Sequence, residues 1–446
     1  MRIAVRPFDK LRANGCRFVI ALVATTTAAH AEPARQWIDP LTGHQVVRVS
    51  REAGSVNLYF HQNSYLPQGD AMVITTPSGI DIVDLKTWNV KPLVRQKGAV
   101  LLFTGRRTRN VYFAERARDD SGKPFAVFAA DADTGKVRRI ATVPGGWIGS
   151  INADETLLLG QVATAVVPLK PDGTLARAGE ENTPGVNDYR ANWPDGRPMT
   201  YADAKETHMN RRLDAGVPME IFTIDTRTGA RRVVTASKDW LNHVQFSPTD
   251  PLQIMYCHEG PWHRVDRVWT IRADGSGKTL VHKRTMNMEI AGHEFWSPDG
   301  KTIWYDLQTP RGQVFWVAGY DIASGKRRQY LVNRNQWGVH FNLSPTEARF
   351  SSDGGDAEMV AKASDAKYLM LLTPRDLPDV AGIHADDADS LISTGTFDTE
   401  KLVDMRKQDY RMEPNMTFTP DGKWIVFRGN FEGAAHVYAV EVAKAK

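Results

Sequence analysis

Short runs of apolar and aromatic residues alternate with tight turns along most of the chain. Two clear runs are residues 301–305 (Lys-Thr-Ile-Trp-Tyr) and 423–427 (Lys-Trp-Ile-Val-Phe), and each follows a Pro-Asp-Gly turn. Proline presets φ at the second position of such a turn, and glycine accepts a positive φ near its end. This pattern predicts successive β-hairpins.

A second turn type, Asp-x-x-(Ser/Thr)-Gly, recurs at 131–135, 225–229 and 321–325. Together the two turn types give a repeat of about 40 to 50 residues, the size of a four-stranded propeller blade. No segment shows the i, i+3, i+4 spacing of a sustained helix. We therefore predict an all-β fold, a seven-bladed β-propeller of four-stranded blades. The blades are expected at 57–95, 99–142, 146–236, 239–283, 288–331, 337–374 and 409–443.

Two segments interrupt this repeat. Residues 165–215 interrupt the third blade, and residues 375–408 separate the sixth blade from the seventh. Both are rich in Asp, Gly, Pro and Ala, and insertions in repeat folds often border the binding face. Residues 46–50 (Val-Val-Arg-Val-Ser) are a candidate for the strand that closes the ring.

The first 31 residues have the pattern of a secretory signal peptide. An apolar stretch at 18–29 follows Arg12 and Arg17, and Ala29-His30-Ala31 supplies small residues at the cleavage position. The stretch is too short to span a bilayer, which needs about 20 residues. We therefore expect a mature chain of residues 32–446, one propeller domain, that is periplasmic or secreted.

The charge balance and the cysteine content limit which partners and which covalent chemistry we expect. Five of the 56 basic residues and one of the 52 acidic residues lie in the leader, which leaves 51 of each. A balanced mature chain gives no reason to expect nucleic acid or a membrane surface as a partner. Cys257 is the one cysteine outside the leader, so no internal disulfide is expected. A lone strand cysteine is more often a small buried residue than a nucleophile.

Four of the twelve histidines share one position in the repeat. His61, His243, His293 and His340 each lie four to five residues before a proline turn, within the innermost strand of a blade. Innermost strands run along the central axis, so the spacing predicts that these side chains converge there. Convergent imidazoles on a rigid scaffold build a metal site or a proton-transfer site.

Other common chemistries lack their motifs. His258-Glu259 with His263 has the wrong spacing for a helical zinc protease, and Gly260-Pro261 would break such a helix. The chain has no G-x-S-x-G nucleophile elbow, no P-loop and no dinucleotide fingerprint.

Several stretches resemble the oligogalacturonate lyase family. The motifs are Cys-His-Glu-Gly-Pro-Trp at 257–262, Gly-His-Glu-Phe-Trp-Ser-Pro-Asp-Gly at 292–300, 336–342, 353–356, 413–428 and 436–441. The resemblance spans most of the mature chain. It implies a seven-bladed propeller that cleaves short pectin fragments by β-elimination with a divalent ion of the Mn2+ type.

The resemblance also implies roles for individual residues. It makes His258 the general base and His293 a metal ligand, with Gln336 and His340 as further ligands. Asn342 stands where the family pattern has a last histidine, and an amide oxygen can ligate a hard cation. Arg211 and Arg212 are candidates to bind a substrate carboxylate, with His243 as a further substrate-side candidate.

The chemistry of a uronate supports this combination of a general base and a divalent ion. Elimination across C4–C5 removes a weakly acidic C5 proton beside a carboxylate, which a cation neutralises while a neutral histidine takes the proton. The leading hypothesis is a lyase for oligogalacturonate or a related uronic acid oligomer. One alternative is a non-catalytic propeller that binds a carbohydrate or protein partner, because fold alone does not fix function. A divergent lyase of another specificity is the third, and the sequence leaves the oligomeric state open.

Overall fold

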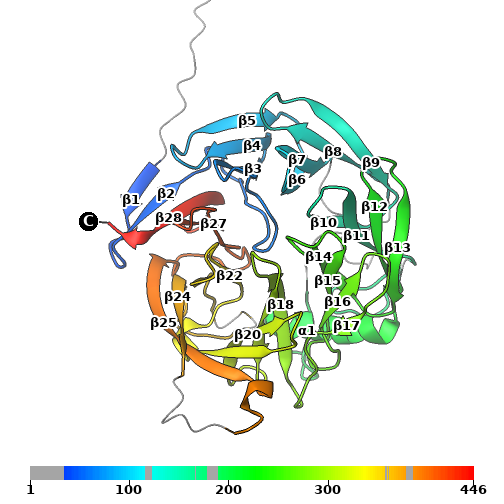
Figure 1. Cartoon of the computed structure of the whole chain (residues 1–446). Coiled ribbons are helices and arrows are strands. Elements are labelled where there is room, and N and C mark those ends of the chain that lie inside the picture. Colours follow the sequence, from blue (N-terminus) through cyan, green and yellow to red (C-terminus); the bar gives the residue numbers. More distant parts are fainter. Residues whose placement is uncertain are drawn as a thin grey trace, which may run out of the picture. The chain divides into compact units, whose positions relative to one another are not determined.

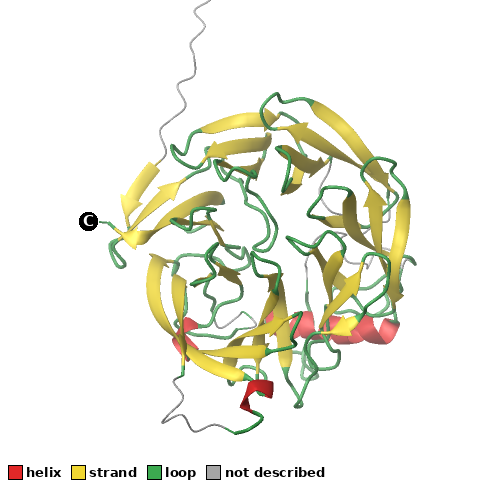
Figure 2. Cartoon of the chain, in the orientation of Figure 1, coloured by secondary structure: helices red, strands yellow, loops and turns green. Residues whose placement is uncertain are grey.

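The computed structural model describes residues 35–115, 123–165, 167–177, 189–356, 359, 361–377 and 385–445. Small antiparallel sheets form a ring around a central axis (Figure 1). Strands dominate the described chain (Figure 2). The predicted all-β propeller is thereby confirmed. The predicted leader, residues 1–31, lies outside the described residues. No helix in the described part of the chain is long and apolar enough to cross a membrane.

The strands group into seven blades, and within a blade the strands follow in sequence order from the axis outwards. The first blade contains β3 (Ala71–Thr76), β4 (Gly79–Asp84) and β5 (Val90–Val94). The second contains β6 (Val100–Thr104), β7 (Asn110–Ala114), β8 (Phe125–Asp131) and β9 (Val137–Val143). The third contains β10 (Trp147–Ile151), β11 (Leu157–Ala163), β12 (Met219–Asp225) and β13 (Arg231–Ser237). The fourth contains β14 (Leu241–Phe246), β15 (Gln253–His258), β16 (Val268–Arg272) and β17 (Thr279–Leu280). The fifth contains β18 (Ile290–Trp296), β19 (Thr302–Gln308), β20 (Phe315–Asp321) and β21 (Arg327–Val332). The sixth is β22 (Phe341–Leu343), β23 (Phe350–Ser352), β24 (Tyr368–Asp376) and β25 (Ser393–Asp404), and the seventh holds β26 (Thr417–Phe418), β27 (Trp424–Gly429) and β28 (His436–Lys444).

An N-terminal strand closes the ring. β2 (His44–Arg48) pairs antiparallel with β28, with Val46 opposite Val440 and Val47 opposite Ala439. β1 (Arg35–Ile38) adds a fifth strand outside it. The closing strand predicted at 46–50 is thereby confirmed within one residue or two of its bounds.

The first blade departs from the predicted four-stranded form. Among the described residues, the segment before β3 makes only isolated bridges, at Val56 and Tyr65. Tyr59, Phe60 and His61 between those bridges turn towards the axis instead of joining a ladder, and their rings contact those of His243 and His340.

The insertion at 165–215 contains a helix that the sequence pattern did not indicate. α1 runs from Tyr201 to Ala215, with a Thr200 N-cap that accepts from Asp203 N and a left-handed Gly216 at its end. Of its buried residues only Met209 is large and apolar, and the others are Ala202, Ala204, Glu206 and His208. Because few of these residues are large and apolar, the helix lacks the hydrophobic period by which sequence reading finds helices.

The second predicted insertion, 375–408, is partly blade. β25 pairs antiparallel with β24 along nine residue pairs and forms the outer strand of the sixth blade. It also pairs in parallel with β21, which joins the fifth and sixth blades into one continuous sheet. Short 3-10 turns lie at η1 (Arg334–Gln336) and η2 (Ala388–Ser390).

Candidate active site

Three histidines share one hydrogen-bonding arrangement. In each, a buried or half-buried carboxylate accepts from ring Nδ1. This fixes the tautomer in which Nε2 keeps its lone pair and faces away from the carboxylate. The pairs are His258 with Asp239 at 2.5 Å, His293 with Asp306 at 2.7 Å, and His340 with Asp353 at 2.6 Å.

Local backbone conformation aims two of the inner-strand histidines. His243 and His293 have φ of 47° and 46°, a left-handed conformation that side chains other than glycine rarely adopt. Both lie at register shifts, where β14 pairs with β15 and β18 pairs with β19. Such bulges redirect a side chain, and they are common beside functional sites.

Gly292 allows the carboxylate of Asp306 to come close to His293. A Cβ at this position would lie 2.9 Å from Asp306 Oδ1, nearer than real carbon atoms approach. A side chain there would therefore push Asp306 away from His293.

His293, His340 and Glu413, which we call the axial cluster, converge from three blades. The His293 and His340 rings lie 4.7 Å apart, and His340 Nε2 lies 3.7 Å from Glu413 Oε2 and 3.1 Å from the Tyr59 hydroxyl. Arg428 Nε donates to the Glu413 carbonyl at 2.8 Å, which fixes this segment at the axis.

The pKa values in the axial cluster reflect mutual attraction. Burial alone raises the pKa of Glu413, but the charges of His340, Lys205 and His293 outweigh it, so the net pKa is lowered. Burial likewise lowers the pKa of His340, while Asp353 and Glu413 reverse this and raise it. The cluster therefore keeps Glu413 ionised, as a ligand for a cation must be.

A small cavity lies against the axial cluster, and we call it the helix-face cavity. It has a volume of about 30 Å³. Its lining includes His293, Glu413, Asp306, Glu259, Trp262 and, from α1, Lys205. Because one water needs about 10 to 15 Å³ of such volume, the cavity can hold an ion or two to three waters, and it is far too small for a sugar.

Lys205 is the cation that α1 brings to this cavity. Its Nζ lies 5.6 Å from the centre of the Trp262 ring, and no carboxylate of the described residues lies within ion-pair distance of it. Arg311 holds the helix over the cavity through Glu206 at 2.7 Å and Asp203 at 3.2 Å.

A second group of possible ligands lies beside this cavity. His243, Cys257 and Glu259 have ligand atoms within 4.8 Å of one another. Burial raises the pKa of the Cys257 thiol well above its usual value, although the charge of Arg267 opposes the shift. His243 Nε2 of this group already pairs with Glu259 at 2.9 Å. A bound metal would deprotonate the thiol, so this group and the axial cluster are two candidate cation sites.

The structure does not gather every predicted site residue. His258 does not line the helix-face cavity, and its ring lies between Tyr256 and Trp269. The next residue, Glu259, takes the cavity-facing position, because neighbouring residues of an extended strand point to opposite sides. His258 Nε2 is buried without a hydrogen-bond partner in the described chain.

Two predicted ligands lie elsewhere. Asn342 lines a different cavity, where its Nδ2 donates to Phe60 O at 3.2 Å and its Oδ1 accepts from Phe418 N at 3.1 Å. Two residues of strand move a side chain about 6.6 Å along the axis from His340, which explains the separation. Gln336 ends the short turn η1, outside the lining of the helix-face cavity, and its buried Oε1 has no hydrogen-bond partner among the described residues.

The two predicted arginines are engaged on α1. Arg211 pairs with Asp172 at 2.7 Å, and Arg212 stacks over Trp240 with 4.6 Å between guanidinium carbon and ring centre. Neither lines the helix-face cavity.

Sequence reasoning assigned no role to Glu413 and Lys205. Glu413 lies six residues before the turn at Thr419, nearly the offset shared by the inner-strand histidines. The same positional rule, applied to carboxylates as well as histidines, would have found Glu413. Lys205 has no comparable signal, because its position depends on a helix that lacks an apolar pattern.

The comparisons with known proteins identify the family. A family model described as oligogalacturonate lyase matches residues 195–446. The oligogalacturonide lyase of Pectobacterium atrosepticum is 23% identical over 427 residues, covering 91% of this chain and 95% of that protein, and the oligogalacturonate lyase of Dickeya dadantii is 22% identical with the same coverage.

Two solved structures share the fold. An oligogalacturonate lyase in complex with manganese superposes with a TM-score of 0.67 at 20% identity, and the oligogalacturonate lyase of Vibrio parahaemolyticus with 0.65 at 19%. Each similarity covers 92% of this chain and 97% of the other. The chain belongs to the oligogalacturonate lyase family.

Proposed function

We propose that the protein is a lyase that cleaves oligogalacturonate, or a related uronic acid oligomer, by metal-assisted β-elimination. The observation that carries this proposal is the axial cluster, in which two carboxylate-oriented imidazoles and one ionised carboxylate converge in a chain of this family. A propeller that only binds a partner would not need that arrangement.

The axial cluster fits a manganese-type ion. His293 and His340 offer Nε2, Glu413 offers a carboxylate, and imidazole with carboxylate is a donor set that such ions accept. Asp306 and Asp353 orient the two rings, as carboxylates commonly do behind metal-binding histidines. When bound, the cation supplies Lewis-acid neutralisation of the substrate carboxylate.

We assign the proton transfer to His258, as the family resemblance implies. Its Nε2 would take the C5 proton of the uronate while the C4–O4 bond breaks and a C4=C5 double bond forms, and the departing O4 would take a proton from water. Asp239 accepts from Nδ1 at 2.5 Å and stabilises the imidazolium that results. Because Nε2 is buried, side chains around it must move before a sugar reaches it.

Lys205 is our candidate to hold the substrate carboxylate, in place of Arg211 and Arg212. Its ammonium faces the helix-face cavity without an ion-pair partner among the described residues. The cavity is too small for a sugar as it stands, so its wall must open when substrate binds.

Export of the mature chain to the periplasm or beyond is also proposed, on the leader alone. Mass spectrometry of the purified mature protein tests it, with Glu32 expected as the first residue. A cell fraction that holds only protein beginning before Ala29 contradicts export by this signal.

The function is tested by incubating the full mature protein with di- and trigalacturonate, with manganese and after chelation. Because the product of a reducing-end unit can rearrange to a keto sugar, mass spectrometry should accompany absorbance. We expect unsaturated or keto-sugar products that require the metal. Saturable binding of the oligomers without turnover under any metal condition would favour the non-catalytic alternative instead.

A further inference from the structure

A second cavity lies at the other end of the central axis, and we call it the turn-face cavity. It has a volume of about 380 Å³ and shares no lining residue with the helix-face cavity. The prolines of five inner-strand turns border it, Pro67, Pro248, Pro298, Pro345 and Pro420. Those turns follow the innermost strands, whereas α1 connects the second and third strands of a blade, so the two cavities open on opposite faces.

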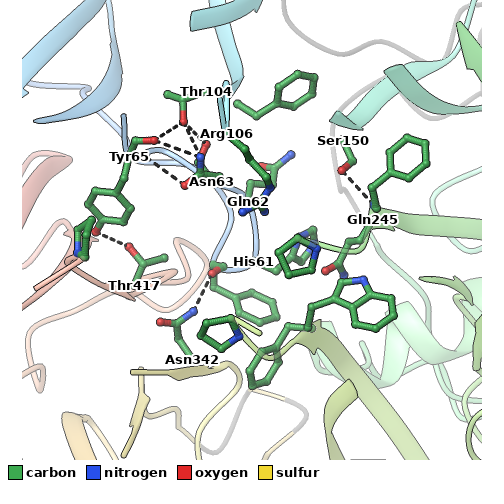
Figure 3. Close-up of a pocket in the computed structure, with 18 of the residues that line it drawn as sticks. His61, Gln62, Asn63, Tyr65, Thr104, Arg106, Ser150, Gln245, Asn342 and Thr417 are labelled. Carbon is green, nitrogen blue, oxygen red and sulfur yellow. Dashed lines mark hydrogen bonds between the residues drawn. The ribbon is translucent and has the colours of Figure 1, made fainter. Parts of the chain in front are cut away.

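The turn-face cavity is large enough for a ligand. Small-molecule sites typically have volumes of about 300 to 1,000 Å³, whereas the helix-face cavity has about a tenth of the lower limit. Polar side chains from several blades surround it, among them Asn63, Arg106, Ser150, Gln245 and Thr417 (Figure 3).

The lining of the turn-face cavity carries positive charge only. None of the described residues in its lining is acidic, and Arg106 is the one arginine or lysine there. Burial together with neighbouring His243 lowers the pKa of His61 to about 3, so that imidazole is neutral. Arg106 is exposed to solvent and stays protonated, as arginine side chains do in proteins.

Arg106 has no counter-charge within the described chain. No hydrogen bond or ion pair joins its guanidinium to another described residue, although the side chain is exposed to solvent. The nearby carboxylate of Glu155 is occupied by the backbone of the same loop, since it accepts from Arg107 N at 2.7 Å and Thr108 N at 2.8 Å. Tyr112 also donates to it. Glu155 therefore fixes the loop that carries Arg106 without pairing with that arginine.

Side-chain amides and buried aromatic residues make up much of the remaining wall. Asn63 and Asn342 use their amide groups to hold backbone segments, so they act as structure. Gln245 differs, because Nε2 donates to Glu294 O at 2.8 Å while Oε1 accepts from no described residue. Five aromatic residues also border the cavity, but each is more than nine-tenths buried in the blade cores: Phe103, Phe246, Phe295, Trp296 and Phe418.

We propose that the turn-face cavity is a second binding site, which takes a small hydroxylated monocarboxylate such as a free hexuronate. Arg106 pairs with the carboxylate through two parallel hydrogen bonds, and Gln245 Oε1 accepts from a hydroxyl. A single cation in a cavity without acidic residues matches a single negative charge. The site does not depend on the proposed function, and only the choice of galacturonate as the probe rests on it.

Calorimetric titration of the full mature protein with D-galacturonate tests the proposal. Four proteins are compared: wild type, Arg106→Gln, Arg107→Gln as the matched control from the same loop, and His293→Ala. We expect saturable binding by wild type, R107Q and H293A, and affinity at least about tenfold weaker for R106Q, as for loss of a charge-assisted hydrogen bond.

Two further probes separate the parts of the ligand. Galactose, which lacks the carboxylate, should not bind, and acetate, which lacks the hydroxyls, should bind more weakly than galacturonate. Acetate that binds as tightly as galacturonate overturns the hydroxylated part. The site itself is overturned if wild type shows no saturable binding, or if H293A abolishes binding while R106Q preserves it. Binding that depends on Arg106 in a protein without lyase activity would defeat the proposed function alone.

Discussion

His293 Nδ1 lies 2.7 Å from Asp306 Oδ1 on the neighbouring strand, and Gly292 leaves the space that this contact needs. The contact orients the His293 ring so that Nε2 faces the axial cluster. The metal affinity of the protein should therefore depend on a residue that touches no metal.

Asp306→Asn is expected to weaken manganese binding by about 10- to 100-fold, because the amide no longer fixes the tautomer of His293. Titration calorimetry with manganese measures this. Asp321→Asn, in an exposed turn of the same blade, is the matched control and should bind as wild type does. Equal manganese affinity of D306N and wild type would show that Asp306 does not orient His293 for metal binding.

His258→Ala should lower kcat by about 10²- to 10⁴-fold, the usual contribution of a general base, while manganese affinity stays unchanged. Asp239→Asn should lower kcat by a smaller factor, because it disturbs the tautomer and not the base itself. Steady-state rates on digalacturonate give both values. Full activity of H258A would assign the proton transfer to another residue, and a parallel loss of metal would make His258 structural.

Lys205→Met should raise KM for digalacturonate by about 10-fold or more, since it removes a charge-assisted hydrogen bond worth about 1.5 to 3 kcal/mol. Lys205→Arg keeps the charge and should restore most of the affinity. If K205M lowers kcat and leaves KM unchanged, Lys205 does not hold the ground-state carboxylate.

Glu289 should stabilise the fold except in strong acid. Burial raises its pKa, but hydrogen bonds from His282 and Thr285 outweigh this and hold it at about 2. The folded pKa thus lies below the unfolded value of about 4.5, so the contribution is present above pH 4.5 and lost as the pH falls to 2. It amounts to at most about 3 kcal/mol.

Chemical denaturation of wild type and Glu289→Gln at several pH values checks this. The difference in free energy of unfolding should be largest near neutral pH and shrink between pH 4.5 and 2. A difference that does not change with pH would assign the effect to packing and not to the charge.

The fold was predictable because its signals are local. Each proline turn reports a hairpin by itself, and their repetition reports a propeller. α1 was not predictable from periodicity, since it buries Ala204, Glu206 and His208 where an amphipathic helix buries large apolar residues. Its Thr200 cap and terminal Gly216 were the usable signals.

Those site residues were predictable whose position in the repeat places them at the axis. His293 and His340 share an offset from their turns, and both reach the axis. His258 and Glu259 are neighbours in one motif, and their side chains point to opposite sides of the strand. Which of them lines the cavity therefore depends on how the strand is oriented. The motif does not carry that information, nor does it carry the ion pair that engages Arg211 with Asp172.

The most direct test is the effect of Glu413→Gln on digalacturonate cleavage at saturating manganese. Glu413 completes the axial cluster, and it contributes a charge that glutamine lacks. Glu432→Gln, which changes a carboxylate near the outer strands of the same blade, serves as the control. We predict that E413Q loses at least about 100-fold in rate and binds manganese more weakly, while E432Q retains both. Full activity of E413Q, with unchanged metal affinity, would contradict the axial cluster as the centre of the reaction.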